Sequence, residues 1–240
     1  MIRKFYEIVR DALVKVALKS MKYHARDFNS FLQKKAHEKT FEILNDELSS
    51  SLIFENKHVF WDFSLNEAIN NNDLNIKNKL VLEFGVGAGK SINYFAKKLS
   101  KNNLTIYGFD TFFGNPEIWP GSDATIGTSN QFGEIPKNLE KNVTIVKGKI
   151  EDTLIEFQKK NKEKIGIMHI DVNVYSSAKF ILENTKSKLQ SGTIIIFDEL
   201  VNYPFWWKNG EFKALKEVFS DDEYKFIAFD NTKKAAIKII

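Results

Sequence analysis

Between residues 79 and 240, short apolar runs alternate with segments in which apolar residues recur every three or four positions. The runs are continuous rather than alternating, which is typical of strands covered by helices on both faces of a parallel sheet, and the spaced segments predict helices. Strands are expected at 79–84, 104–110, 143–147, 165–171, 193–198, 224–229 and 235–240, with helices near 92–99, 152–160, 178–189 and 211–219. This alternation predicts a Rossmann-like, doubly wound α/β domain with a mostly parallel sheet.

The last two apolar runs depart from the parallel pattern. Only residues 230–234 join them, and a parallel crossover needs a dozen residues or more. The chain is therefore expected to end in an antiparallel β-hairpin.

The N-terminal region has a different pattern. Residues 1–24 and 31–44 show helical spacing, so residues 1–60 are expected to form a helical extension and residues 61–240 the main domain. The extension is basic, with ten Lys and Arg against four Asp and Glu in residues 1–40. It could bind a membrane surface or cover a substrate, but the absence of a wide apolar face favours packing on the domain or on a second copy, as in a homo-oligomer.

Composition excludes several classes of protein. The chain lacks cysteine, which excludes disulfides and thiolate zinc sites. No uncharged apolar run approaches the ~20 residues of a membrane span, and no signal peptide is recognisable, so a cytoplasmic protein is expected. Beyond residue 40 acidic residues outnumber basic ones, 27 to 25, so the main domain is not expected to bind nucleic acid.

A glycine-rich turn follows the first strand of the main domain, with the sequence Glu-Phe-Gly-Val-Gly-Ala-Gly-Lys-Ser at residues 83–91. A phosphate-binding P-loop needs glycine where Phe84 stands, and a dinucleotide fingerprint needs it at Lys90. S-adenosylmethionine (SAM) fits better, because Glu83 could hold the amino group of its methionine part and Asp110, at the end of the next strand, could accept its ribose hydroxyls. The other candidate contacts in these two turns are Gly85, Gly87, Gly89, Ser91, Thr111 and Phe112.

Five segments together resemble the class I SAM-dependent methyltransferases, and most closely the macrocin O-methyltransferase-like branch, which methylates sugars. They are LEFGVGAGKSI (82–92), YGFDTFFGNPE (107–117), GKIEDTL (148–154), HIDVNVYSS (169–177) and IIIFDEL (194–200). A sixth segment, VNYPFWWKNGEFKAL (201–215), resembles related sugar methyltransferases. The resemblance implies a seven-stranded sheet whose final strand is antiparallel, and SAM contacts at Glu83, Gly85, Gly87, Asp110 and the edge formed by Ile150 and Glu151. It also implies a divalent cation, usually magnesium, and an acceptor that is a saccharide or nucleotide-linked sugar.

Carboxylates end two consecutive apolar strands. Asp171 follows one strand, and Asp198 and Glu199 follow the next, so all three should meet at the carboxyl edge of the sheet, where ligands bind. An oxygen-only cluster favours a hard ion such as Mg²⁺, which would lower the pKa of an acceptor hydroxyl. Ordinary solvation at loop edges is the alternative. Asp171 is also a candidate cofactor contact.

The general base is left open by the sequence. Members of the family commonly carry an acid where this chain has Asn173, and an amide cannot remove a proton. The base is then Asp171, His169 or none, although a lone strand histidine is more often a buried core residue. This departure supports one alternative, a metal-independent N- or O-methyltransferase of small molecules. A second alternative is a SAM-binding module without catalysis, whose basic N-terminal helices mediate assembly. Aromatic residues in the loops at 111–142 and 203–207 could cover the ligands or pack as a hydrophobic cluster.

Overall fold

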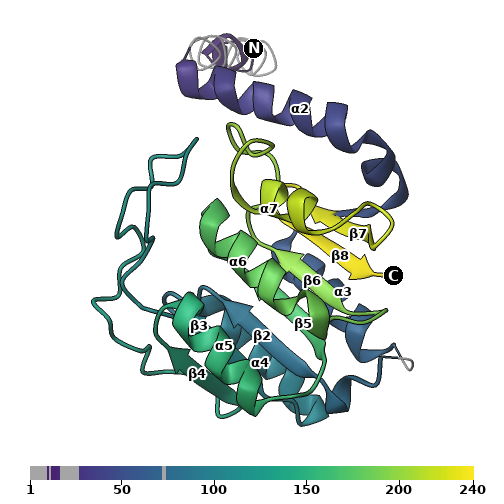
Figure 1. Cartoon of the computed structure of the whole chain (residues 1–240). Helices are drawn as coiled ribbons and strands as arrows, with labels where there is room; N and C mark the ends of the chain where they lie inside the picture. The colour runs from purple at the N-terminus through teal and green to yellow at the C-terminus, as the bar shows by residue number, and fades with distance from the viewer. Residues whose placement is uncertain (1–9, 11, 17–26, 72–73) are drawn as a thin grey trace, which may run out of the picture.

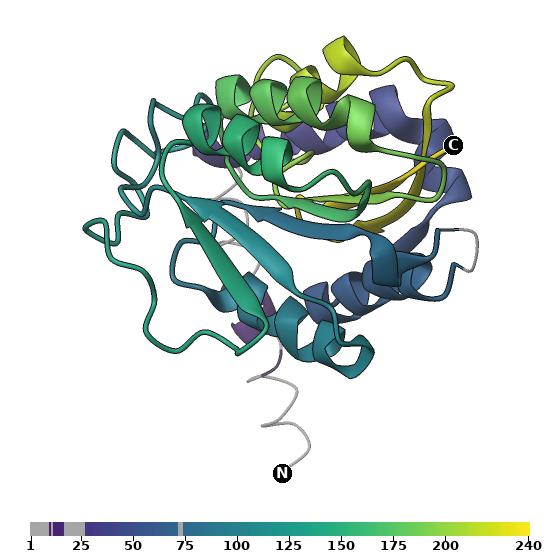
Figure 2. The ribbon, with the colours of Figure 1, turned by 60° about the horizontal axis from the view of Figure 1, so that its bottom comes forward.

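The computed structural model describes residues 10, 12–16, 27–71 and 74–240, and these form one mixed sheet with helices on both faces (Figures 1 and 2). The strands are β1 (Leu52–Phe54), β2 (Leu80–Phe84), β3 (Ile106–Asp110), β4 (Val143–Lys147), β5 (Ile165–Ile170), β6 (Ile194–Phe197), β7 (Tyr224–Asp230) and β8 (Ala235–Ile239). The α-helices are α2 (Phe28–Ser50), α3 (Lys57–Ile69), α4 (Lys90–Leu99), α5 (Ile150–Lys160), α6 (Tyr175–Thr185) and α7 (Gly210–Val218). Short 3₁₀ helices lie at Ile76–Asn78, Ser100–Asn102 and Lys186–Lys188.

The strand order is β1-β7-β8-β6-β5-β2-β3-β4, and β8 runs antiparallel to both of its neighbours. From β2 the chain proceeds outward to β3 and β4, then returns to β5 on the other side of β2. The carboxyl ends of β2 and β5 therefore flank the point where the winding direction reverses, which is where open α/β sheets bind ligands.

The expected α/β architecture is confirmed, and the seven expected strands are β2–β8, including the terminal hairpin. The sheet also has an eighth strand that we did not expect: β1 pairs with β7 in parallel, with Leu52 opposite Ala228. Three residues are too few for a recognisable strand pattern. The boundary expected at residue 60 falls inside α3, and the division into extension and domain remains a prediction.

Alternate residues of the strands supply two hydrophobic layers. In β2, Leu80, Leu82 and Phe84 pack towards α5, α6 and α7, whereas Val81 packs towards α3 and α4. Figure 2 shows these two sets of helices on opposite faces of the sheet. Residues on the same side as Val81, Glu83 among them, thus lie between the sheet and the α3–α4 layer.

Helix α2 confirms the helix expected at 31–44 and begins after Asp27, whose side chain accepts a hydrogen bond from the Asn29 backbone N–H. It lies across the segment that follows β6, where the buried Trp206 indole donates to the Ala36 carbonyl oxygen at 3.2 Å (Figure 1). The helix expected at 1–24 falls largely outside the described residues. Among the residues that are described, no helix is both long and apolar enough to cross a bilayer.

Candidate active site

The glycine turn joins β2 to α4 and depends on backbone angles that favour glycine. Gly85 has φ +88° and Gly87 has φ +49°. A β-carbon on Gly85 would lie 1.8 Å from the carbonyl oxygen of Asp171, whereas one on Gly87 would meet no atom within 4 Å. Gly85 therefore allows β2 and β5 to approach closely. Gly87 faces open space, where a ligand can come close to the protein backbone.

Asp110 closes the turn from the end of β3. One of its carboxylate oxygens accepts hydrogen bonds from the backbone N–H groups of Val86 at 2.8 Å and Gly87 at 2.7 Å, and the other accepts from Phe112 at 2.6 Å. A phosphate bound at this turn would need these N–H groups, so the arrangement disfavours dinucleotides and nucleoside triphosphates. The second oxygen keeps a lone pair, and the predicted contact of Asp110 with ribose hydroxyls remains a prediction.

Glu83 occupies a different environment from the one we expected. Its side chain is completely buried, one carboxylate oxygen accepts from the Ser91 hydroxyl at 2.9 Å, and the other lies 3.2 Å from Nδ1 of His169. The predicted contacts of Glu83 and Ser91 with the cofactor therefore have no support in this geometry, because both groups face each other inside the protein.

The remaining candidate cofactor residues surround the same edge of the sheet. The Gly148 N–H donates to the Asp110 carbonyl oxygen at 3.0 Å, which brings the start of α5, with Ile150 and Glu151, beside the end of β3. Phe112 is buried, and the Thr111 hydroxyl accepts from the Phe113 N–H at 3.1 Å. A β-carbon on Gly89 would lie 3.0 Å from Leu139 and 3.4 Å from Pro136 of the long loop, and the predicted contact of Gly89 with the cofactor remains a prediction.

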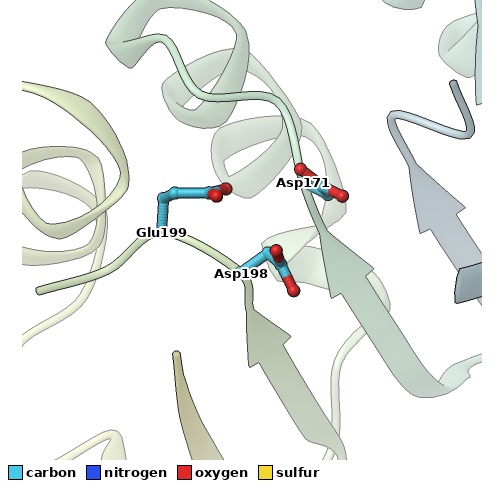
Figure 3. Close-up of side chains that lie close together, drawn as sticks. All are labelled: Asp171, Asp198 and Glu199. Carbon is cyan, nitrogen blue, oxygen red and sulfur yellow. The ribbon is translucent and has the colours of Figure 1, made fainter. Parts of the chain in front are cut away.

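The three predicted metal ligands converge. Carboxylate oxygens of Asp171, Asp198 and Glu199 lie within 4.8 Å of one another at the carboxyl ends of β5 and β6 (Figure 3). Asp171 is tied to the glycine turn, because its N–H donates to the Phe84 carbonyl oxygen at 2.9 Å. The carboxylate cluster and the glycine turn are thus parts of one site.

Charge in this cluster is poorly balanced by the protein itself. Burial, with repulsion from Asp198 and Glu199, raises the pKa of Asp171 well above its ordinary value. Burial also raises the pKa of Glu199 to about 7, with a further contribution from Asp198. A divalent cation would relieve the same repulsion, so the residues present fit the proposed ion.

Asp198 is the exception in the cluster. Burial alone would raise its pKa, but His169 and Lys234 outweigh this effect and lower the pKa to about 2. Lys234 donates to one carboxylate oxygen at 2.8 Å, and Nε2 of His169 lies 3.5 Å from the other. Within the cluster, Asp198 is thus the carboxylate that neighbouring basic side chains stabilise.

The structure argues against His169 as the general base. Its side chain is 1% exposed and lies between Glu83 and Asp198. Burial lowers the pKa of His169, but the two carboxylates outweigh burial and raise the pKa to about 10. A histidine buried between two carboxylates is poorly placed to remove a proton from an acceptor.

Asn173 lies at the rim of the cluster with φ +62°, and its amide donates to the Asn115 side chain at 3.1 Å. Asn115 belongs to the long loop between β3 and β4, so Asn173 joins this loop to the end of β5. A positioning contact replaces the acid–base role that an acid would have here. Of the three possibilities for the base, Asp171 and no base remain.

Two residues of the site carry no sequence signal. Lys234 comes from the turn of the terminal hairpin, and Glu211 from the first turn of α7, where one oxygen accepts from the Glu199 N–H at 3.2 Å. Glu211 is fully buried, and burial, with repulsion from Glu199, raises its pKa well above the ordinary value. Both are separated in sequence from the carboxylate residues that they contact, so the contacts follow from the fold and not from a local sequence pattern.

The aromatic loop residues divide between the two roles considered. Trp119 and Tyr203 are buried and meet edge to face with 5.2 Å between ring centroids, and the Lys233 ammonium lies 4.8 Å from the Trp119 ring. These residues form a packed cluster that joins three loops. Phe113 and Phe132 are 60% and 83% exposed and stay available to cover a ligand.

The sheet is doubly wound with one antiparallel strand, and the backbone N–H groups of the glycine turn are occupied by the Asp110 carboxylate. These features are those of the class I methyltransferase fold. Residues 82–200, which contain the glycine turn and all three carboxylates, match a family described as a methyltransferase domain. The identification of the chain as a SAM-dependent methyltransferase is confirmed.

Solved structures show the same fold. The calicheamicin methyltransferase CalS11 is 21% identical, with a TM-score of 0.59 over 76% of this chain and 78% of that one. Its apo form, described as a TDP-rhamnose 3'-O-methyltransferase, gives 22% identity and a TM-score of 0.55 over the same shares. The O-methyltransferase NovP is 17% identical, with a TM-score of 0.59 over 76% and 79% of the two chains. No curated protein matches the sequence.

Proposed function

We propose that this protein transfers a methyl group from SAM to a hydroxyl of a saccharide or nucleotide-linked sugar, with assistance from Mg²⁺. The observation that carries the proposal is the cluster of Asp171, Asp198 and Glu199 beside the glycine turn. The likeness in fold to a TDP-rhamnose methyltransferase supports a sugar acceptor.

The residues divide the task between them. The glycine turn, with Asp110, would bind the cofactor, whose sulfonium supplies the methyl group. Asp171, Asp198 and Glu199 would hold Mg²⁺, which supplies the positive charge that makes an aliphatic hydroxyl more acidic. The contact between Asn173 and Asn115 would keep the long loop against the cluster and orient the acceptor, because methyl displacement depends on alignment of the reacting atoms.

Asp171 is the remaining candidate for the proton acceptor. Its carboxylate lies beside those of Asp198 and Glu199 at the carboxyl ends of β5 and β6, where the acceptor hydroxyl would bind. A hydroxyl made acidic by the cation could also lose its proton to solvent, in which case no base is required.

The test is mass spectrometry of a panel of sugar nucleotides incubated with the full chain and SAM, with Mg²⁺ or with excess EDTA. We expect methylated product with Mg²⁺, loss of activity with EDTA and its return on addition of Mg²⁺. Asp171→Ala should abolish turnover, whereas Asp222→Ala, at an exposed turn after α7, should not. Undiminished activity in EDTA would contradict the metal role.

Two observations favour a metal-independent enzyme. His169 and Lys234 lie beside Asp198 and already compensate its negative charge. Asn173 also replaces the acid that members of the family commonly carry at this position. Such an enzyme would methylate amines or hydroxyls of small molecules equally well in EDTA. A cofactor-binding protein without turnover on any acceptor would instead indicate an assembly role, and assembly through the N-terminal helices remains a prediction.

A further inference from the structure

A chain of polar side chains runs along the α3–α4 face of the sheet, between the glycine turn and the carboxylate cluster. The Ser91 hydroxyl, in the first turn of α4, donates to Glu83 of β2 at 2.9 Å. Glu83 is directly opposite His169 of β5 in the parallel register, and their side chains lie 3.2 Å apart. His169 then reaches Asp198 at the end of β6, with 3.5 Å between Nε2 and the carboxylate oxygen.

This arrangement is costly, because Glu83 and His169 are 0% and 1% exposed and an ion pair loses hydration when it is buried. The rings of Trp61 and Phe95 contact the edges of the imidazole, with centroids 6.2 and 4.9 Å away, and keep it in one orientation. His169 is thus fixed on one side by Glu83 and on its flanks by aromatic rings. Its remaining nitrogen faces only Asp198.

Asp198 needs such a support more than the other two carboxylates do. Lys234, in the hairpin turn, donates to one of its oxygens at 2.8 Å. The other oxygen lies 3.5 Å from Nε2 of His169, so a basic side chain on each side would restrict the rotation of the carboxylate. Groups that orient metal-binding carboxylates in this way affect affinity although they never touch the ion.

We propose that His169 is a positioning residue that orients Asp198 for the divalent cation and is itself held by Glu83 and Ser91, so that the support of the metal site begins behind the glycine turn. The proposal rests on the proposed function in one respect, the binding of a cation at Asp171, Asp198 and Glu199. It assigns to Glu83 and Ser91 a structural role in metal binding in place of direct contact with the cofactor.

The test is calorimetric titration of the full chain with Mg²⁺ alone and, separately, with S-adenosylhomocysteine. His169→Gln should weaken Mg²⁺ binding by about 10- to 100-fold, the usual effect of losing such an outer partner, and leave the affinity for S-adenosylhomocysteine within about twofold. Ser91→Ala, at the far end of the chain of contacts, should weaken Mg²⁺ binding by a smaller factor, about threefold. His37→Gln, an exposed histidine of α2, is the matched control and should change neither affinity.

Unchanged Mg²⁺ affinity in both His169→Gln and Ser91→Ala would overturn the proposal while leaving the proposed function intact. If His169→Gln fails to fold, as judged by circular dichroism, unchanged Mg²⁺ affinity in Ser91→Ala overturns it. Wild-type protein that binds S-adenosylhomocysteine but not Mg²⁺ would refute the metal site itself. An equal loss of both affinities in His169→Gln would show a general structural role and would also overturn the proposal.

Discussion

Gly85 and Gly87 allow a sharp test of the glycine turn, because both have positive φ but only one is in contact with β5. Alanine at either position adopts a left-handed conformation, which costs about 1–2 kcal/mol. At Gly85 the new β-carbon would also lie 1.8 Å from the Asp171 carbonyl oxygen, so the two strands must move apart by more than an ångström to reach the 3.0 Å below which real β-carbons are essentially never found.

That movement breaks specific contacts. The Gly85 N–H donates to Phe109 and the Asp171 N–H to Phe84, each at 2.9 Å, and each bond contributes about 1 kcal/mol. Gly85→Ala should therefore lower the free energy of unfolding by about 3–4 kcal/mol, and Gly87→Ala by about 1–2 kcal/mol.

The measurement is equilibrium urea unfolding of both variants and the wild type, followed by tryptophan fluorescence and circular dichroism. In Gly87→Ala, the affinity for S-adenosylhomocysteine should suffer more than the stability, because the new β-carbon projects into the open space of the turn. This variant should fold well but lose about tenfold or more in affinity, equivalent to about 1.4 kcal/mol. Equal stability of the two variants would refute the assignment of Gly85 to the contact between β2 and β5.

Three further predictions concern residues around the site. Gly108→Ala places a β-carbon 2.4 Å from the Ile92 side chain and should destabilise the protein by about 1–3 kcal/mol in urea unfolding, while a loss below 0.5 kcal/mol would mean that β3 and α4 are not closely packed. Glu211→Gln replaces a buried carboxyl whose pKa is raised with a neutral isostere, so we expect a change below about 1 kcal/mol at neutral pH, and a much larger loss would indicate that Glu211 is ionised. Trp206→Phe removes the hydrogen bond to Ala36 and should cost about 1 kcal/mol and speed proteolysis within α2, whereas unchanged proteolysis would show that α2 docks by other contacts.

The pattern of the sequence predicted the sheet well because the strands of the parallel core are mostly apolar runs, and β3, β5 and β6 each lead into a carboxylate. The carboxylates Asp171, Asp198 and Glu199 could be placed together for the same reason, since parallel strands end at one edge. The three-residue strand β1 and helix α3 were missed, because one is too short for a pattern and the other is apolar on most sides.

The roles of Glu83 and His169 could not be predicted from spacing. Both lie within buried strands, and sequence alone does not tell which residue faces the crevice and which faces the helix layer. Their pairing depends on the register of β2 with β5, and the support from Lys234 depends on the position of a hairpin turn 36 residues beyond Asp198. Such contacts arise from topology rather than from local sequence.

The most direct test of the account is titration of the purified full chain with S-adenosylhomocysteine, NADH and ATP under identical conditions. The closed glycine turn predicts saturable, one-to-one binding of S-adenosylhomocysteine that SAM displaces, with much weaker binding of the two phosphate-containing ligands. Tight binding of NADH or ATP, with none of S-adenosylhomocysteine, would contradict it.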